Sequence, residues 1–203
     1  MAPPQVLVIG GPNGAGKTTF AEGVLPTTIP ITEYVNADVI AKGLSAYAPE
    51  RVALSAGRIM LNRLRELAES RSTFAFETTL STRSFAPFLS KLRSNGYEVT
   101  VVYVWLNSPD LAIRRVATRV LKGGHHVPDE TVRRRYHRSA ANLLRLYLPL
   151  AHRVRVYDNS NPAHPLLVAE KPLPADLVVY NQPHWSQLQT EANRAEEISP
   201  SDE

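Results

Sequence analysis

The chain has 203 residues, 43% of them hydrophobic and 21% charged, which is typical of one globular domain. It contains no cysteine, which excludes disulfide bonds and thiolate metal sites. The N-terminal residues show no signal pattern and no apolar run approaches the roughly 20 residues that span a bilayer, so we expect a cytoplasmic protein. The net charge is +4, and eleven Lys or Arg fall between residues 111 and 155, where we expect an anionic ligand.

The first recognisable element is a phosphate-binding loop. Residues 5–9 form a continuous apolar run, which predicts a strand buried in a parallel sheet, and a helical pattern begins at residue 17. Between them lies the pattern of Gly, four residues, Gly-Lys-Ser/Thr, whose backbone N–H groups cradle phosphates at a helix N-terminus. We expect Lys17 to reach the β- and γ-phosphates of ATP and the Thr18 hydroxyl to bind Mg²⁺. The residues predicted to bind ATP are Gly11, Pro12, Asn13, Gly14, Ala15, Gly16, Lys17, Thr18 and Thr19.

Beyond the loop, strand patterns alternate with helical patterns. The expected strands are residues 34–36, 73–76, 99–106 and 153–157, with short edge strands at 166–169 and 177–179. The expected helices are residues 17–25, 49–69, 83–95, a helix that starts at 109, and 129–147. This alternation predicts a P-loop NTPase fold, three-layer α/β/α, with a mainly parallel sheet of five or six strands. One domain is expected over residues 1–182, with a helical lid at about 115–138 and a frayed or disordered polar tail at 183–203.

Carboxylates at two strand ends are the first catalytic candidates, because the crevice of a parallel sheet lies at the carboxyl ends of its strands. Asp38 follows the second strand and is predicted to be the base that accepts the proton of an attacking hydroxyl; the alternative is an N-cap of a following helical turn. Glu77 ends the third strand beside the loop. It is predicted to bind magnesium through water or to hold the acceptor, and the alternative is a structural ion pair with an arginine.

The basic segment supplies the cations that phosphoryl transfer needs. Two basic helical patterns flank Gly123-Gly124, which we expect to hinge a lid that closes over the triphosphate. Arg119 and Arg135 are predicted to stabilise the charge of the transition state, with Arg115, Arg134 and Arg138 as alternatives. The competing interpretation is a solvated basic face. His125-His126 is expected to be lid structure, because no third metal ligand lies nearby in the sequence.

Five separated motifs resemble, in order, those of the zeta toxin family in its short stand-alone form. Together with the loop they cover about residues 6–170, and they are Asn36-Ala37-Asp38, Phe76-Glu77-Thr78-Thr79-Leu80-Ser81, Arg115-Val116-Ala117-Thr118-Arg119, Gly123-Gly124-His125 with Val127-Pro128, and Tyr157-Asp158-Asn159-Ser160. The loop also resembles that of transporter-type ATPases. Their Leu-Ser-Gly-Gly-Gln signature is absent from this chain.

The resemblance implies a kinase that uses ATP and Mg²⁺ to phosphorylate a small-molecule hydroxyl, which in characterised members is the 3′-hydroxyl of UDP-N-acetylglucosamine. It also implies an antitoxin protein as a partner. By similarity, Lys17 and Thr18 bind phosphate and magnesium, Asp38 is the base, and Arg119 is a lid arginine. Family members carry an arginine where this chain has Ser81, so Arg83 is the nearest substitute. The residues predicted to bind the acceptor are Asn36, Asp38, Glu77, Thr79 and Arg83.

Three classes of function therefore remain for the chain. A small-molecule kinase is favoured over a nucleotide hydrolase or switch. A P-loop enzyme that acts on nucleic acid is the third class, and it rests only on the basic segment. We expect neither a membrane nor a nucleic acid as a partner.

Overall fold

The chain forms one twisted sheet with helices on both faces. The structure is a computed structural model, which describes residues 2–28, 31, 33–121, 123–124 and 126–197. The strands are β1 (Gln5–Gly10), β2 (Glu33–Val35), β3 (Phe74–Thr78), β4 (Glu98–Trp105), β5 (Arg153–Asp158), β6 (Leu166–Lys171) and β7 (Val178–Val179). The helices are α1 (Lys17–Thr28), α2 (Ala37–Leu44), α3 (Ala53–Glu69), α4 (Phe85–Ser94), α5 (Pro109–Leu121), α6 (Asp129–Asn142), α7 (Leu148–Leu150) and α8 (Gln182–Glu197), with a 3₁₀ turn at Pro49–Val52 and a π turn at Leu143–Tyr147.

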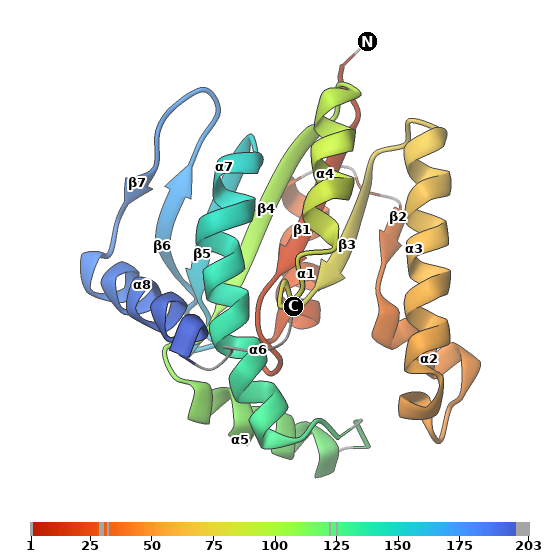
Figure 1. Ribbon diagram of the computed structural model, residues 1–203, viewed down its shortest axis with the longest axis vertical. Coiled ribbons are helices and arrows are strands. Elements are labelled where there is room, and N and C mark those ends of the chain that lie inside the picture. Colours follow the sequence, from red (N-terminus) through yellow and green to blue (C-terminus); the bar gives the residue numbers. More distant parts are fainter. Residues whose placement is uncertain (1, 29–30, 32, 122, 125, 198–203) are drawn as a thin grey trace.

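The strand order brings the ends of the parallel strands together. The order is β2-β3-β1-β4-β5-β6-β7; the first five strands are parallel, and β6 and β7 add antiparallel. In Figure 1, α4 and the α6–α7 segment lie in front of the sheet and α1 lies behind it. The predicted mainly parallel α/β/α fold is confirmed. The sheet has seven strands rather than five or six, because both short segments after β5 join it.

Burial on both faces explains why the central strands are apolar at successive positions. Val6 and Val8 of β1 point to one face of the sheet and Leu7 and Ile9 to the other, and all four are buried. Trp105 ends β4 inside the core. Among the described residues, no helix has the length and apolar character needed to cross a membrane.

Two helices differ from the sequence-based expectation. α1 runs through Pro26 to Thr28, although Pro26 was expected to end it. α2 was predicted as no more than a turn, because its eight residues are too few for a clear helical period. Its N-cap is Asn36, whose side-chain oxygen accepts hydrogen bonds from the backbone N–H groups of Asp38 and Val39.

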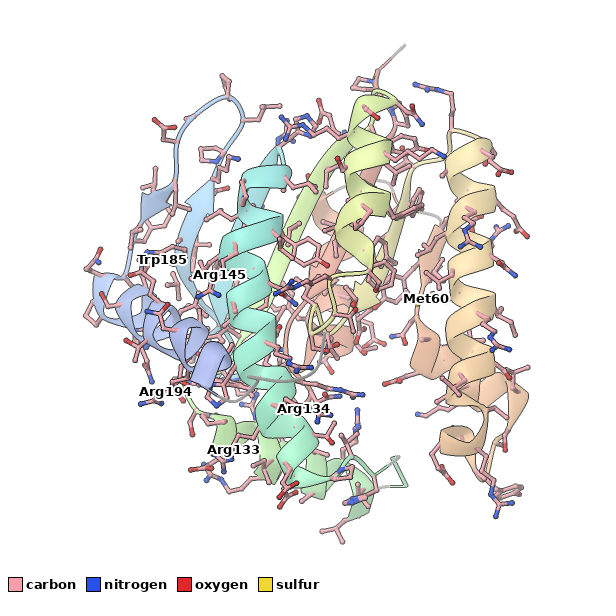
Figure 2. The ribbon with its side chains drawn as sticks, in the orientation of Figure 1. Met60, Arg133, Arg134, Arg145, Trp185 and Arg194 are labelled. Atoms are coloured by element: carbon pink, nitrogen blue, oxygen red, sulfur yellow. The ribbon has the colours of Figure 1, made fainter. Side chains whose placement is uncertain are left out.

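The C-terminal segment is a packed helix, and the prediction of a frayed or disordered tail is wrong for residues 183–197. Trp185, Leu188 and Ala192 of α8 are buried, and α8 packs against α6; Figure 2 shows Trp185 on α8. Their spacing of i, i+3 and i+7 makes a narrow apolar stripe on one face of the helix. The segment is polar on average, so its composition does not reveal this stripe. Glu191 is also buried, and its carboxylate lies 3.0 Å from His137 of α6.

This packing makes Leu188 a sensitive position for stability. Leu188→Ala should lower the free energy of unfolding by about 2–5 kcal/mol, because it leaves a cavity under α8. Leu121→Ala is the matched control, since the Leu121 side chain at the end of α5 is 88% exposed and its loss should change stability by about 0.5 kcal/mol or less. Urea unfolding of both variants compares them. Equal effects would mean that α8 does not pack in solution.

Candidate active site

A pocket of about 730 Å³ opens at the carboxyl ends of the parallel strands. Its lining comes from the phosphate-binding loop, from the ends of β2 and β3, and from helices α2, α3, α5 and α6. The residues that line it are Asn13, Gly14, Gly16, Lys17, Thr18, Thr19, Asn36, Ala37, Asp38, Ala53, Leu54, Gly57, Arg58, Met60, Leu61, Glu77, Thr78, Thr79, Ser84, Phe85, Arg115, Arg119 and Arg135.

The phosphate-binding loop has the tight curvature that its glycines allow. A Cβ atom on Gly11 would lie 2.0 Å from the carbonyl oxygen of Val104 in β4, so no other residue fits between the two strands there. Gly14 has φ of +78°, in the left-handed region that favours glycine. Asn159, after β5, donates a hydrogen bond of 2.8 Å from its amide to the carbonyl of Ala15 and so holds the loop from outside. Gly11, Pro12 and Ala15 shape the loop without lining the pocket.

Lys17 points into the pocket and is already surrounded by polar groups. Its side chain is 8% exposed, and its ammonium group donates to the carbonyl of Pro12 at 3.1 Å and lies 3.8 Å from a carboxylate oxygen of Glu77. Burial lowers the pKa of Lys17, and the charge of Glu77 acts in the opposite direction. A buried ammonium group with one distant counter-ion is well placed to bind an additional anion such as phosphate.

Glu77 is the centre of the hydrogen-bond network beside Lys17. One of its carboxylate oxygens accepts hydrogen bonds from the Thr18 hydroxyl at 2.8 Å, from the Tyr34 hydroxyl at 2.7 Å and from the Asn36 amide at 2.9 Å. Burial, and then the charge of Glu77, raise the pKa of Tyr34, so Tyr34 remains a donor. The alternative interpretation, an ion pair between Glu77 and an arginine, is wrong, because the cation beside Glu77 is Lys17.

This network also suits a magnesium ion at Thr18. Because the Thr18 proton is donated to Glu77, the lone pairs of the hydroxyl oxygen remain available to a cation, and Mg²⁺ prefers oxygen ligands of this kind. Within the described part of the chain, no group of three or more His, Cys, Asp or Glu side chains forms a metal site of its own. Of the His125-His126 pair, residue 125 lies outside the described residues.

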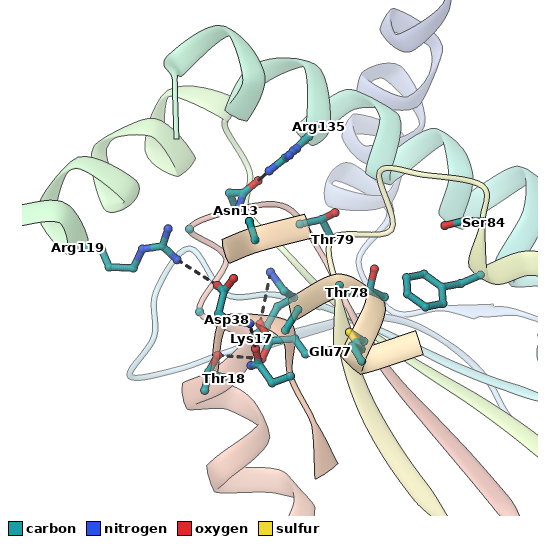
Figure 3. A pocket seen from close by; sticks show the side chains of 18 of the residues that line it. Asn13, Lys17, Thr18, Asp38, Glu77, Thr78, Thr79, Ser84, Arg119 and Arg135 are labelled. Carbon is teal, nitrogen blue, oxygen red and sulfur yellow. Dashed lines mark hydrogen bonds and ion pairs between the residues drawn. The ribbon is translucent and has the colours of Figure 1, made fainter. Parts of the chain in front are cut away.

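Asp38 lies in the first turn of α2 and lines the pocket. Asn36, not Asp38, caps that helix, so the interpretation of Asp38 as an N-cap is wrong. The Asp38 side chain is 60% exposed, and one of its carboxylate oxygens lies 3.9 Å from the guanidinium of Arg119. Figure 3 shows Asp38 among the residues that line the pocket, with its carboxylate directed toward Arg119.

Two helices bring the predicted arginines to the same side of the pocket. Arg119 comes from α5, and Arg135 of α6 donates a long hydrogen bond of 3.5 Å to the side-chain oxygen of Asn13 in the loop. Burial, followed by the neighbouring charge of Arg134, lowers the pKa of Arg135. The backbone of Gly124 packs against Arg119, because a Cβ atom there would lie 2.6 Å from the Arg119 side chain. The Gly124 N–H also donates a hydrogen bond of 2.9 Å to the Arg119 carbonyl, so the chain after α5 passes close to Arg119 at a position where only glycine fits.

Most of the remaining basic residues of the segment have partners within the protein. Arg115 lines the pocket and donates to the carbonyl oxygens of Asn159 at 3.0 Å and Ser160 at 2.8 Å. Sequence reasoning ranked Arg115 only as an alternative, because its contacts involve a segment 44 residues away. Three further arginines of the segment form ion pairs: Arg133 with Asp110, Arg153 with Glu98, and Arg155 with Glu170.

The far wall of the pocket comes from residues that the sequence did not single out. It is largely apolar and consists of Ala53, Leu54, Gly57, Arg58, Met60 and Leu61 of α3, with Ser84 and Phe85 at the start of α4. Arg83, predicted to bind the acceptor, is exposed and does not line the pocket. Helix α4 begins two residues later and carries Phe85 inward instead. Thr79 does line the pocket, beside Glu77.

Comparison with known proteins finds the same fold in solved structures. The complex of AvrRxo1-ORF1 with AvrRxo1-ORF2 and ATP has the same fold, with a TM-score of 0.74 at 14% identity over 100% of this chain and 67% of that chain. A structure of the PezAT chromosomal toxin-antitoxin system of Streptococcus pneumoniae gives a TM-score of 0.62 at 17% identity, covering 98% of this chain and 88% of that one. A Haemophilus influenzae protein described as uncharacterized is 27% identical over 129 residues, which are 62% of this chain and 88% of its own length.

The family is decided by the sequence rather than by these distant structures. The family model described as zeta toxin matches residues 2–165, which include the phosphate-binding loop and every strand from β1 to β5. The chain is a nucleotide-binding P-loop kinase that belongs to the zeta toxin family.

Proposed function

We propose that this kinase transfers the γ-phosphoryl group of ATP, with Mg²⁺, to a hydroxyl group of a UDP-N-acetylamino sugar. The observation that carries the proposal is the position of Asp38: its carboxylate lines the same pocket as Lys17, faces Arg119, and is free of helix capping. A base at this position can accept the hydroxyl proton while the oxygen attacks phosphorus.

The loop side of the pocket would hold ATP. Lys17 would neutralise the β- and γ-phosphates, and Arg119 and Arg135 would neutralise charge that develops on the transferred group. Mg²⁺ bound at Thr18, with Glu77 behind it, would supply further charge neutralisation between the phosphates. Phosphoryl transfer requires positioning and electrostatic stabilisation more than covalent chemistry, and these residues provide both.

The α3 side of the pocket would hold the acceptor. Leu54 is 83% exposed and Leu61 is 38% exposed, and both line the pocket beside Phe85. Exposed apolar side chains inside a pocket favour a ligand with an apolar surface of its own. The ring or acetyl group of a nucleotide sugar has such a surface, whereas a simple polyol does not.

The partners of the basic residues favour this function over action on nucleic acid. A protein that binds nucleic acid through phosphates needs a surface of available Lys and Arg. Here three arginines of the segment line the pocket, and Arg133, Arg153 and Arg155 pair with carboxylates. The fold neighbours named for two-component complexes also support a protein partner, and we propose an antitoxin that binds this chain.

Acceptor-dependent turnover tests the proposal directly. The protein is incubated with ATP, Mg²⁺ and UDP-N-acetylglucosamine, ADP release is measured with and without the sugar nucleotide, and the product is identified by mass. We expect the sugar nucleotide to stimulate ADP release and to gain one phosphate. ADP release without an acceptor would indicate a hydrolase, and a phosphorylated compound found only in a metabolite pool would change the acceptor and leave the kinase reaction intact.

Gly57 allows a test of where the acceptor lies. Gly57 lines the pocket, and a Cβ atom on it would meet nothing within 4 Å, so the backbone there has room for a side chain that extends into the pocket. Gly57→Leu should raise the KM for the acceptor about tenfold or more by occupying its space, which corresponds to about 1.4 kcal/mol of lost binding. Equilibrium binding should show an unchanged ATP affinity, because the loop side is untouched.

Gly43→Leu in α2 is the matched control. Gly43 is also a helical glycine with nothing within 4 Å of an added Cβ, but it does not line the pocket. Both variants replace glycine with a better helix former, so each should be about as stable as the wild type or more stable. A KM that stays normal in Gly57→Leu would move the acceptor away from α3.

A further inference from the structure

One face of α6 and of the π turn after it carries a row of buried polar side chains that the catalytic assignments do not use. Ser139 is fully buried and donates a hydrogen bond of 2.6 Å to the carbonyl of Thr79. Asn142 is 9% exposed and donates at 2.8 Å to the carbonyl of Leu80. Tyr147 is fully buried and donates at 3.2 Å to the carbonyl of Thr82.

These donors share a face with Arg135, which contacts the phosphate-binding loop. Ser139 and Asn142 follow Arg135 at i+4 and i+7, the spacing of one helix face. Tyr147 is twelve residues from Arg135, and in a regular α-helix it would lie about 120° away from that face. The π turn at Leu143–Tyr147 absorbs one extra residue, which rotates the helix face by about 100° and brings Tyr147 back onto the same row.

The loop that receives these hydrogen bonds has little support from regular structure. Residues 79–84, which we call the acceptor loop, connect β3 to α4 and belong to no helix or strand. Leu80 has φ of +55°, an unusual conformation for a leucine, and its buried side chain packs against Gly10. A non-glycine residue in this region of φ persists only where its surroundings hold it. The hydrogen bonds from α6 and the π turn to three carbonyl groups of the loop supply that restraint.

We infer that Ser139, Asn142 and Tyr147 are positioning residues, which hold the acceptor loop at a fixed distance from the arginine side of the pocket. Thr79 lines the pocket on the acceptor side, and Arg135 lines it on the phosphate side. The same helix contacts both sides: Arg135 hydrogen-bonds to Asn13, and Ser139, one turn further along α6, hydrogen-bonds to the carbonyl of Thr79. Ser139 is itself fixed, because it accepts a 3.0 Å hydrogen bond from the buried hydroxyl of Tyr103 in β4. The expected effect on catalysis rests on the proposed function, whereas the expected effect on the acceptor loop does not.

Removing one hydroxyl group tests this inference. Tyr147→Phe deletes the donor to Thr82 and keeps the ring in the core. We expect faster amide hydrogen exchange in residues 79–84 and a fall in kcat for acceptor phosphorylation of about tenfold, because small misplacements of reacting groups are costly to rate. ATP affinity should stay within about twofold of the wild type, since the loop contact of Arg135 is unchanged. Ser139→Ala, which removes the donor to Thr79, should act in the same direction.

Tyr97→Phe separates positioning from loss of stability. The Tyr97 hydroxyl is the same kind of buried donor: its nearest acceptor is the carbonyl of Ser72 at 3.0 Å, with the carbonyls of Leu67 and Ala68 at 3.3 and 3.4 Å. Tyr97 lies just before β4, at the amino ends of the parallel strands and so at the opposite end of the sheet from the pocket. Tyr97→Phe should lower the melting temperature about as much as Tyr147→Phe does. It should leave kcat and the amide hydrogen exchange of residues 79–84 unchanged. The acceptor in these assays is UDP-N-acetylglucosamine or the compound identified by mass.

Each outcome decides a different point. Unchanged exchange of residues 79–84 in both Tyr147→Phe and Ser139→Ala would overturn the inference, whatever the acceptor. Faster exchange with a normal kcat would also overturn it, because the loop would then be structural only. A wild-type protein that transfers no phosphoryl group, while the variants still free the loop, would overturn the proposed function and not the hydrogen-bond arrangement.

Discussion

Lys17→Ala should reduce acceptor phosphorylation by about 10³-fold or more, the largest effect expected from any single substitution in this protein. Among the residues that the structure describes, Lys17 is the one lysine that lines the pocket, and its ammonium group is buried between the Pro12 carbonyl and Glu77. Because water does not screen a charge at such a site, its removal leaves the β- and γ-phosphates without their main counter-charge. Steady-state turnover at saturating ATP measures the loss.

The control for this substitution is Lys91→Ala. Lys91 is exposed in the last turn of α4, and its loss removes the same charge and the same methylene groups outside the pocket. We expect normal turnover from that variant. Turnover near the wild-type rate in Lys17→Ala would instead show that the phosphates bind elsewhere, and the site assignment would then fail.

Asp38→Asn should lower acceptor phosphorylation by about 10²-fold or more and leave ATP binding intact. The substitution keeps the size of the side chain and removes its basicity, so the acceptor hydroxyl loses the group that takes its proton. ATP contacts the loop through Lys17 and its neighbours, whereas the Asp38 carboxylate faces Arg119 of α5. Acceptor-dependent ADP release and ATP affinity, measured on the same preparation, separate the two effects.

Asp129→Asn is the matched control for Asp38→Asn. Asp129 is exposed in the first turn of α6, just as Asp38 lies in the first turn of α2, so both substitutions lose a similar interaction with a helix N-terminus of about 0.3–1 kcal/mol. Asp129 does not line the pocket. If both variants lose equal activity, or neither does, Asp38 is not the base.

Local patterns in the sequence were sufficient for the fold class and for the place of the phosphate-binding loop between β1 and α1. The apolar run of β1, the Gly-rich loop and Lys17 are contiguous, and their conformation depends on glycine backbone freedom and helix geometry. Strand ends were also predictable, because alternation of strands and helices implies a parallel sheet. The same alternation therefore put Asp38 and Glu77 at the correct edge of the sheet.

Contacts between distant segments were not predictable in the same way. Arg83 was chosen for its distance along the sequence from Thr79, but the start of α4 exposes it and turns Phe85 toward the pocket. The prediction of a disordered tail failed because only a few apolar residues occur in this polar segment, and its average composition is that of a tail. Their burial results from packing of α8 against α6, which the sequence of the segment does not show.

The sequence by itself determined the α/β class, the phosphate-binding loop and the family, since each depends on residues that are close neighbours in the chain or on motifs in a set order. Only the tertiary structure decided that Asn36 caps α2 and leaves Asp38 available, that Glu77 gathers Thr18, Tyr34 and Asn36, and that α6 holds the acceptor loop. The physical reason is that a side-chain hydrogen bond depends on direction and distance within about 3 Å, and these are set by the packing of helices on the sheet. Spacing along the chain does not carry that information.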